Sequence, residues 1–209
     1  MHETVFVVDD DEAVRDSLRW LLEGNGFRVA AFESAERFLA YLGAMPAGPG
    51  CLILDVRMPG MTGNELHDEL IRRNVALPII FITGHGSVPM AVESMKKGAI
   101  DFLEKPFNDE QLCALTAKAL EKARGESERV QEAQRAQELV SRLTPREAQV
   151  LERIVAGRLN KQIADDLNIS IKTVEAHRAN IMDKIEARTM ADLMKTALAA
   201  SVPGAAQNP

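Results

Sequence analysis

Val5-Phe-Val-Val-Asp9-Asp10-Asp11 is an apolar run of strand length that ends in three acids. A lone acid, Asp55, closes a second apolar run, and a lone base, Lys105, follows a third. Parallel α/β sheets gather functional groups at the carboxyl ends of their strands, so these charged residues are expected to meet. Carboxylates gathered there repel one another unless a cation joins them, and Mg²⁺ prefers such hard oxygen ligands. The pattern therefore predicts magnesium and phosphate chemistry at one edge of a sheet.

Residues 1–122 alternate short apolar runs with amphipathic helical patterns, and Val14, Leu18 and Leu22 show the helical spacing clearly. Strict alternation of strand and helix predicts an α/β fold, a doubly wound (βα)5 domain with a parallel sheet. The run 77–82 is apolar without alternation, as in a strand that is buried on both faces. The expected strands are 5–8, 28–32, 51–54, 78–83 and 102–104, and the expected helices lie near 12–24, 34–43, 63–73, 87–97 and 108–122.

The stretch 123–141 is rich in Glu, Gln, Arg and Ala but has few large apolar residues. This composition favours a solvated helical linker. A dimerising coiled coil is the alternative, because Val130, Ala133, Gln137 and Val140 fall near the required spacing. Only two of these four are large apolar residues, so the apolar contact between two such helices would be small.

Residues 142–201 follow an all-α pattern of four helices. Thr144 is a natural N-cap, Pro145 suits the first helical position, and Glu147 stands at the capping-box offset from Thr144. Gly157 ends that helix, and the next helices are expected at 160–167, from 170 or 171 to about 186, and from about 189 to 200. The sequence thus predicts domain 1–122, linker 123–141, domain 142–201 and a disordered tail 202–209.

Composition sets the broad class. The chain of 209 residues, 46% hydrophobic and 27% charged, suits one large or two modest globular domains. Its net charge of -6 is unevenly spread: the part from Arg142 onward carries 10 Lys+Arg and 8 Asp+Glu, a net +2, so the remainder carries −8. The mildly basic part could meet a polyanion that the acidic part would repel.

Nothing in the sequence indicates secretion, a disulfide or a membrane span. Cys51 and Cys113 lie far apart without a zinc spacing, so free thiols are expected. The start of the chain shows no signal-peptide pattern, and no apolar run approaches membrane-spanning length. We expect a cytoplasmic protein with no membrane partner.

Four motifs carry a resemblance to the receiver domain of bacterial two-component response regulators. Each is weak alone, but together, in order and at strand ends, they are specific and span about 120 residues. The motifs are Val8-Asp-Asp-Asp11, Leu54-Asp-Val-Arg-Met-Pro-Gly60, Ile82-Thr-Gly-His85 and Glu104-Lys-Pro-Phe107.

The resemblance implies that Asp55 is a nucleophile that takes a phosphoryl group to form an acyl phosphate. Mg²⁺ would be held by Asp10, Asp55 and the backbone carbonyl of Arg57, with Asp9 acting through water. Lys105 and the Thr83 hydroxyl would contact phosphate oxygens. The family pattern also implies a cis Lys105–Pro106 bond. Asp11, next to the metal ligands, is expected to be only a helix N-cap or first-turn acid.

Three further residues have implied regulatory roles. Phe102 resembles the aromatic switch that packs inward when Thr83 is drawn to the phosphate, although plain core packing is the alternative. Arg57 and His85 lie two residues beyond Asp55 and Thr83, where the family tunes the lifetime of the phosphoryl group. Neither is expected to be catalytic.

The C-terminal half resembles the LuxR-type four-helix output domain, and the whole chain resembles the FixJ/NarL family of transcriptional regulators. The resemblance rests on the stretches 143–151, 160–167 and 170–182. The recognition helix of such a domain enters the major groove. Lys161, Lys172 and Thr173 are expected at DNA phosphates, and Glu175, Ala176, Arg178 and Ala179 at base edges, with a solvated face as the alternative for each. His177 is expected to pack within the domain.

The resemblance also implies partners: a sensor histidine kinase, promoter DNA, RNA polymerase and a second copy of the chain. The domain charge of +2 implies modest affinity for DNA as a monomer, and a dimer would double the contacts. The helix near 87–97 is expected to bury Val88, Ala91, Val92 and Met95. This would leave Met90, Ser94 and Lys97 as the candidate dimer patch, together with strand 102–104.

Two other classes of protein remain open. An aspartyl-nucleophile phosphohydrolase would use the same acids, Mg²⁺ and lysine, but it has no need of a helix-turn-helix. A constitutive DNA-binding protein with a vestigial receiver would not need the intact acid set. A dinucleotide-binding protein is excluded, because the chain has no Gly-x-Gly-x-x-Gly stretch.

Overall fold

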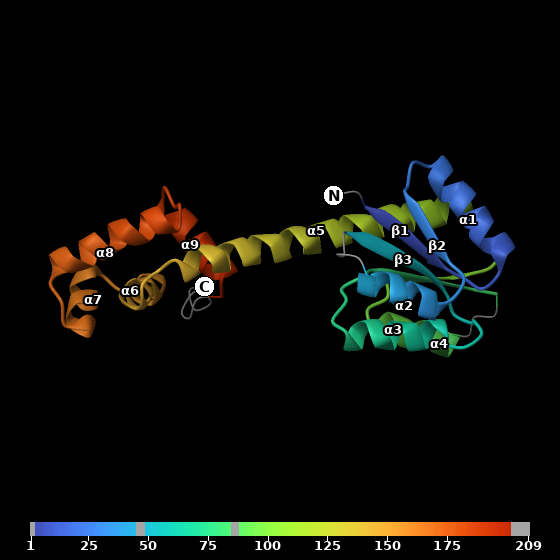
Figure 1. Ribbon diagram of the computed structural model, residues 1–209, viewed down its shortest axis with the longest axis horizontal. Coiled ribbons are helices and arrows are strands. Elements are labelled where there is room, and N and C mark those ends of the chain that lie inside the picture. The colour runs from blue at the N-terminus through green and yellow to red at the C-terminus, as the bar shows by residue number, and fades with distance from the viewer. Residues whose placement is uncertain (1–2, 45–48, 85–87, 202–209) are drawn as a thin grey trace. The chain divides into compact units, whose positions relative to one another are not determined.

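The computed structural model describes residues 3–44, 49–84 and 88–201 (Figure 1). The chain divides into two compact units, Met1–Ser127 and Glu128–Pro209, and each is described by itself below. The tail 202–209, expected to be disordered, lies outside the described residues.

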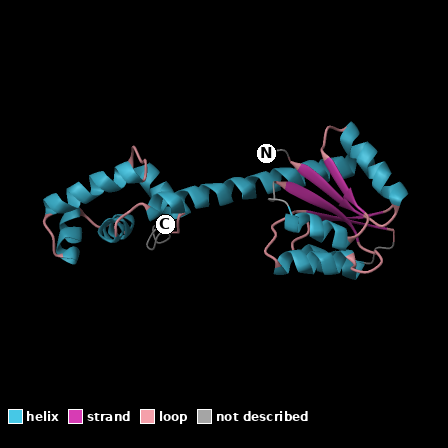
Figure 2. Ribbon diagram, viewed as in Figure 1, coloured by secondary structure: helices cyan, strands magenta, loops and turns pink. Residues whose placement is uncertain are grey.

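The N-terminal unit is built on one sheet of five parallel strands (Figure 2). The strand order is β2-β1-β3-β4-β5, as a doubly wound fold requires. The register places Val8 opposite Leu54, Asp55 opposite Ile82 and Thr83 opposite Glu104, so the functional strand ends lie at one level. The strands are β1 (Thr4–Val8), β2 (Val29–Phe32), β3 (Gly50–Asp55), β4 (Ile79–Thr83) and β5 (Asp101–Glu104).

Helices cover both faces of the sheet and confirm the predicted fold class (Figure 1). One core joins Phe6 and Phe81 to α2 and α3, and the other joins Val5 and Ile53 to α1 and the first part of α5. Asp11 is the N-cap of α1, as predicted. The helices are α1 (Glu12–Gly24), α2 (Ala35–Ala44), α3 (Gly63–Arg72), α4 (Val88–Lys96) and α5 (Asp109–Ser141), each close to its predicted range except that α5 is much longer.

The exposed face of α4 differs from the prediction. Ser94, expected at the surface, is 2% exposed and its hydroxyl lies 3.3 Å from the Asn64 side-chain oxygen of α3. Val92 and Met95, expected in the core, are 46% and 44% exposed. Lys97 forms an ion pair of 2.7 Å with Asp68 of α3. Polar contacts with α3 therefore set the rotation of α4, which the apolar pattern placed wrongly; the side chain of Met90 lies outside the described residues.

The C-terminal unit has the predicted helices, α6 (Pro145–Val155), α7 (Asn160–Leu167), α8 (Ile171–Lys184) and α9 (Met190–Ala199). Thr144 and Glu147 form the predicted capping box, and Glu147 is also buried against Lys184 at 2.6 Å. This Lys184 hydrogen bond lowers the pKa of Glu147 to about 2. Between α7 and α8, Asn168 adopts a left-handed conformation (φ 58°) that turns the chain. The core holds Val150, Leu151, Ile163, Ala164, Val174, Ile181 and Leu193.

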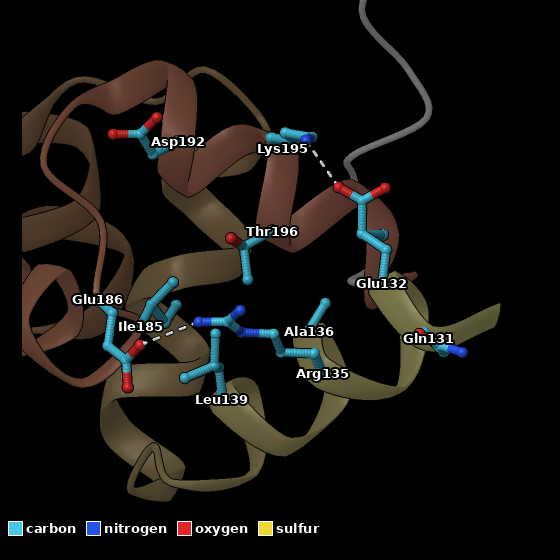
Figure 3. Close-up of a pocket in the computed structure, with 11 residues that line it drawn as sticks. Gln131, Glu132, Arg135, Ala136, Leu139, Ile185, Glu186, Asp192, Lys195 and Thr196 are labelled. Carbon is cyan, nitrogen blue, oxygen red and sulfur yellow. Dashed lines mark ion pairs between the residues drawn. The ribbon is translucent and has the colours of Figure 1, made fainter. Parts of the chain in front are cut away.

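The last part of α5 belongs to this unit, which corrects the expected boundary at residue 142 and the linker solvated along its whole length. Ala136 and Leu139 are buried and line a groove of about 530 Å³ together with Ile185 (Figure 3). Two ion pairs cross the groove, Lys195–Glu132 at 2.7 Å and Arg135–Glu186 at 3.5 Å (Figure 3). Two buried side chains on one face are enough to pack this part of α5 into the C-terminal unit, although its composition alone predicts a solvated helix.

Replacing Leu139 with alanine is expected to destabilise the C-terminal unit by about 2–4 kcal/mol, because a buried side chain is lost and a cavity remains. Val130→Ala is the matched control on the same helix; Val130 is 54% exposed, so its change should stay within about 0.5 kcal/mol. Denaturant unfolding of the full chain, followed by circular dichroism, measures both. Equal effects of the two substitutions would contradict the packing described.

Candidate functional site

Three charged side chains from distant parts of the chain meet at the carboxyl edge of the sheet. Asp9 follows β1, Asp55 ends β3, and Lys105 follows β5. The Lys105 Nζ donates to Asp9 Oδ2 at 2.7 Å and to Asp55 Oδ1 at 2.9 Å. Asp9 is 1% exposed and Asp55 6%, so both carboxylates are buried against the lysine. The sequence-based expectation that these groups would gather is met.

Backbone amides fix the other carboxylate oxygens. Asp9 Oδ1 accepts from the Asp11 amide at 2.9 Å, and Asp55 Oδ2 accepts from the Arg57 amide at 2.7 Å. Helix α3 starts directly beside Asp55. Its first residue, Gly63, lies so close that a Cβ at this position would collide with the Asp55 carbonyl oxygen. The two acids are therefore held in one orientation before any ligand arrives.

The electrostatics of the pair favour a further cation. Burial raises the pKa of Asp9 above its usual range, in spite of the hydrogen bond from Lys105. Burial opposes the charge of Lys105, but its hydrogen bonds to Asp9 and Asp55 outweigh this, and the pKa of Lys105 is raised. Lys105 is therefore charged at neutral pH, while the charged form of Asp9 remains poorly solvated.

The donor set fits a hard cation. Asp9 and Asp55 supply carboxylate oxygens, and Asp10, adjacent to Asp9, is exposed to solvent. Mg²⁺ takes oxygen ligands and keeps several waters, so a few protein oxygens suit it. In the described ranges 3–44, 49–84 and 88–201, no three His, Cys, Asp or Glu side chains are already arranged to hold a metal. The carbonyl of Arg57 would have to supplement them.

The remaining predicted receiver residues lie near this edge or outside the described part. Thr83 is 1% exposed at the end of β4, and Arg57 is exposed after β3. Phe102 is partly buried, and its ring centroid lies 6.3 Å from that of Phe81. The Lys105–Pro106 bond is cis, as the family pattern implied. His85 lies outside the described residues.

The sequence pattern gave no reason to select His67, yet its ring packs against that of Phe81. It is 5% exposed, its ring centroid lies 5.6 Å from that of Phe81, and within the described part of the chain its Nδ1 has no hydrogen-bond partner. Nothing in the pattern of α3 distinguishes this position from an ordinary helix residue. Burial lowers the pKa of His67, while Asp68 and Lys97 act in opposite directions on it.

The lowered pKa of His67 predicts a pH-dependent stability of the N-terminal unit. The imidazole of His67 binds a proton less readily in the folded protein than in the unfolded chain. The free energy of unfolding therefore keeps its full value above the unfolded pKa of about 6.5 and decreases as the pH falls below about 6.5. His67→Leu should reduce the loss of thermal midpoint between about pH 7.5 and pH 5.5 relative to wild type. Identical losses in the two proteins would show that His67 does not carry the effect.

In the C-terminal unit, most of the predicted DNA contacts are exposed. Lys161 lies on α7, and the rest lie on α8. Ser170 caps α8 by accepting from the Thr173 amide at 3.0 Å, and the two hydroxyl groups are 2.8 Å apart. His177 is half-buried, as expected, and so is Arg178. The exposed residues are Lys161, Lys172, Thr173, Glu175, Ala176 and Ala179.

Comparison with known families supports both halves of this description. The model of the response regulator receiver domain matches residues 5–117, and that of the bacterial regulatory proteins of the luxR family matches residues 141–197. In the described part of the chain, no helix combines the length and apolar character needed to cross a membrane.

Relatives match along nearly the whole chain. The transcriptional regulatory protein FixJ of Bradyrhizobium diazoefficiens is 43% identical over 95% of this chain and 96% of its own length. FixJ of Rhizobium meliloti is 47% identical over 94% and 95%. The solved structure of the response regulator StyR covers 95% of this chain and 99% of its own, with 43% identity and a TM-score of 0.84. Full-length FixJ from B. japonicum covers 95% and 97%, with 43% identity and a TM-score of 0.57.

These likenesses are to transcriptional regulators and not to classical enzymes. The chain therefore belongs to the response regulator family and is a FixJ-like transcriptional regulator, with a receiver domain followed by a LuxR-type DNA-binding domain.

Proposed function

We propose that Asp55 accepts a phosphoryl group from a sensor histidine kinase, and that this event promotes receiver dimerisation and promoter binding. The observation that carries the proposal is the Lys105 amine, which joins Asp9 and Asp55 at 2.7 and 2.9 Å on the carboxyl edge of the sheet. A buried nucleophile beside a fixed cation and a second acid is the arrangement that phosphoryl transfer to a carboxylate needs.

Each residue has a distinct task in the transfer. A carboxylate oxygen of Asp55 attacks phosphorus, the new O–P bond forms, and the bond from phosphorus to the imidazole nitrogen of the donor breaks. Lys105 moves from the carboxylates to a phosphate oxygen, and the Thr83 hydroxyl donates to another. Arg57 and His85 tune the lifetime of the acyl phosphate by controlling the approach of water. Self-phosphorylation and autodephosphorylation are then the only chemistry of the receiver.

Receiver domains generally depend on Mg²⁺ for phosphorylation. We assign the ion here to Asp10, Asp55 and the backbone carbonyl of Arg57, with Asp9 acting through water. The bound ion supplies positive charge to the transferring phosphoryl oxygens. The poorly solvated carboxylate of Asp9 supports this assignment, because a cation offsets the unfavourable charge.

The signal would leave the site through Thr83 and Phe102. Movement of Thr83 toward the phosphate frees space that the Phe102 ring, already against Phe81, can enter. The receiver then has two states of similar free energy, and phosphorylation favours one of them. We place the dimer surface on β5 and the exposed side of α4. This surface includes the exposed side chains of Val92 and Met95, and it leaves out Ser94, which the sequence pattern placed at the surface but which is buried.

The output domain would bind promoter DNA through α7 and α8, in the cytoplasm and in contact with RNA polymerase. Lys161, Lys172 and Thr173 would contact phosphates, and Glu175, Ala176, Arg178 and Ala179 would face base edges. The net charge of +2 from Arg142 onward gives a single domain few phosphate contacts. Two domains held in one dimer would gain through effective concentration, which makes binding depend on phosphorylation.

Two substitutions on α8 are expected to weaken DNA binding in different ways. Lys172→Ala should weaken binding to all sequences and lower the log–log salt slope by about one. Arg178→Ala should cost about 1–3 kcal/mol on the operator and relax the preference at one base pair. Fluorescence anisotropy on operator and scrambled duplexes over a range of salt separates the two. The same loss on both duplexes for Arg178→Ala would remove this residue from base reading.

Capture of genomic fragments tests the proposed function as a whole. Protein treated with beryllofluoride and Mg²⁺ should enrich a small set of fragments, and untreated protein should not. Equal enrichment without beryllofluoride would instead favour the constitutive DNA-binding alternative. Turnover of small phosphate esters, with no enrichment, would favour the phosphohydrolase alternative.

A further inference from the structure

Arg15, on the first turns of α1, reaches back to the acid cluster. Its Nη1 donates to the backbone carbonyl oxygen of Asp9 at 2.8 Å, and the side chain is half-buried. The neighbouring arginine on this helix, Arg19, instead forms an exposed pair of 3.4 Å with Asp16. The two arginines of α1 therefore have different partners, and only Arg15 touches the strand end that carries the acids.

The bond to the Asp9 oxygen fixes more than Asp9. A peptide unit is planar, so the carbonyl oxygen of Asp9 shares one plane with the amide nitrogen and Cα of Asp10. The hydrogen bond to that oxygen restrains the rotation of the peptide plane, and thus the direction in which the Asp10 side chain projects from the backbone. Asp10 itself is exposed to solvent.

The residues on either side of Asp10 are also restrained. The Asp11 amide donates to Asp9 Oδ1 at 2.9 Å, and the Asp11 carboxylate caps α1 by accepting from the Ala13 amide at 2.9 Å. Arg15 closes this turn from the helix side, because its own amide donates to the Asp11 carbonyl at 3.0 Å. The turn that presents Asp10 is thus held by Asp9, Asp11 and Arg15.

We propose that Arg15 is a positioning residue for the Mg²⁺ ligand Asp10: it holds the Asp9–Asp10 peptide in the orientation from which Asp10 and Asp55 share one cation. The inference rests on the proposed function, since it assumes a magnesium site at Asp10 and Asp55. Arg15 touches neither the metal nor the phosphoryl group. Groups that orient metal ligands in this way commonly change metal affinity by about 10–100-fold when they are replaced.

The charge of Arg15 has the opposite effect on the metal. The positive charge of the guanidinium at the Asp9 carbonyl oxygen repels a divalent cation, so a role through charge alone predicts tighter Mg²⁺ binding when Arg15 is removed. A positioning role predicts weaker binding. The sign of the change in the dissociation constant therefore separates the two explanations.

The test is the Mg²⁺ affinity of the full-length chain, measured by calorimetry and by the fluorescence of Trp20, which lines one groove with Lys105. Arg15→Met, which keeps bulk but has no donor, should weaken Mg²⁺ binding about tenfold. Arg15→Lys, which keeps a donor and the charge, should recover most of the affinity. Arg19→Met is the matched control and should bind Mg²⁺ as wild type does.

A second measurement separates positioning from general damage to the fold. The rate of phosphorylation by acetyl phosphate should reach the wild-type maximum in Arg15→Met at saturating Mg²⁺, with the half-saturating concentration raised about tenfold. If Arg15→Met does not fold, Arg15→Gln and Arg15→Lys carry the same comparison. Unchanged or tighter Mg²⁺ binding in folded Arg15→Met or Arg15→Gln overturns the inference. Wild-type protein that binds no Mg²⁺ would overturn the proposed function instead.

Discussion

Asp55→Asn is expected to abolish both acyl phosphate formation and phosphorylation-dependent DNA binding. The amide of asparagine is not a nucleophile at neutral pH, and no other described carboxylate is paired with Lys105 except Asp9, whose oxygens are held by Lys105 and the Asp11 amide. Incorporation of phosphate from labelled acetyl phosphate with Mg²⁺ should fall to background. Gel shifts on a captured fragment should no longer respond to acetyl phosphate.

The control is Asp11→Asn, an acid in the same motif. Asp11 is exposed and caps α1, and asparagine is an equally good N-cap, so phosphorylation should proceed as in wild type. If the Asp55→Asn protein still dimerises and binds its promoter fully in acetyl phosphate and Mg²⁺, the assignment of Asp55 as the phosphoacceptor fails.

Lys105→Ala is expected to destabilise the N-terminal unit by about 3–5 kcal/mol at neutral pH, because two buried carboxylates lose the cation that joins them. Added Mg²⁺ should restore part of this loss and raise the unfolding midpoint of the variant more than that of wild type, since the ion takes over the charge compensation. Thermal unfolding with and without Mg²⁺ measures both effects.

The pH dependence of the Lys105→Ala variant follows from the raised pKa of Asp9. A carboxyl group whose folded pKa lies above its unfolded value destabilises the fold at high pH, and the penalty disappears below the unfolded value of about 3.9. The deficit of the variant should therefore shrink as the pH falls. Lys97→Ala is the control, because the surface pairs of Lys97 with Asp68 and Glu93 are worth at most about 1 kcal/mol. Equal losses in the two variants would contradict the role given to Lys105.

The sequence determined the architecture and the location of the candidate site. Strand and helix follow from local apolar periodicity, and parallel connectivity then places the ends of β1, β3, β4 and β5 at one edge. Asp9, Asp55 and Lys105 were expected to meet for this reason alone, and they do. Caps such as Thr144 with Glu147 were also readable, because they depend on residues three positions apart.

Only the tertiary structure decided which faces of the helices are covered. Ser94 is buried and Val92 exposed because α4 makes polar contacts with α3. Leu139 is buried where α5 lines one groove with Ile185, a residue far along the chain. The contacts of Arg15 with the Asp9 carbonyl and of His67 with Phe81 leave no trace in periodicity. Local patterns fix the conformation of a segment, whereas the partner of each side chain depends on the packing of segments that are distant in the sequence.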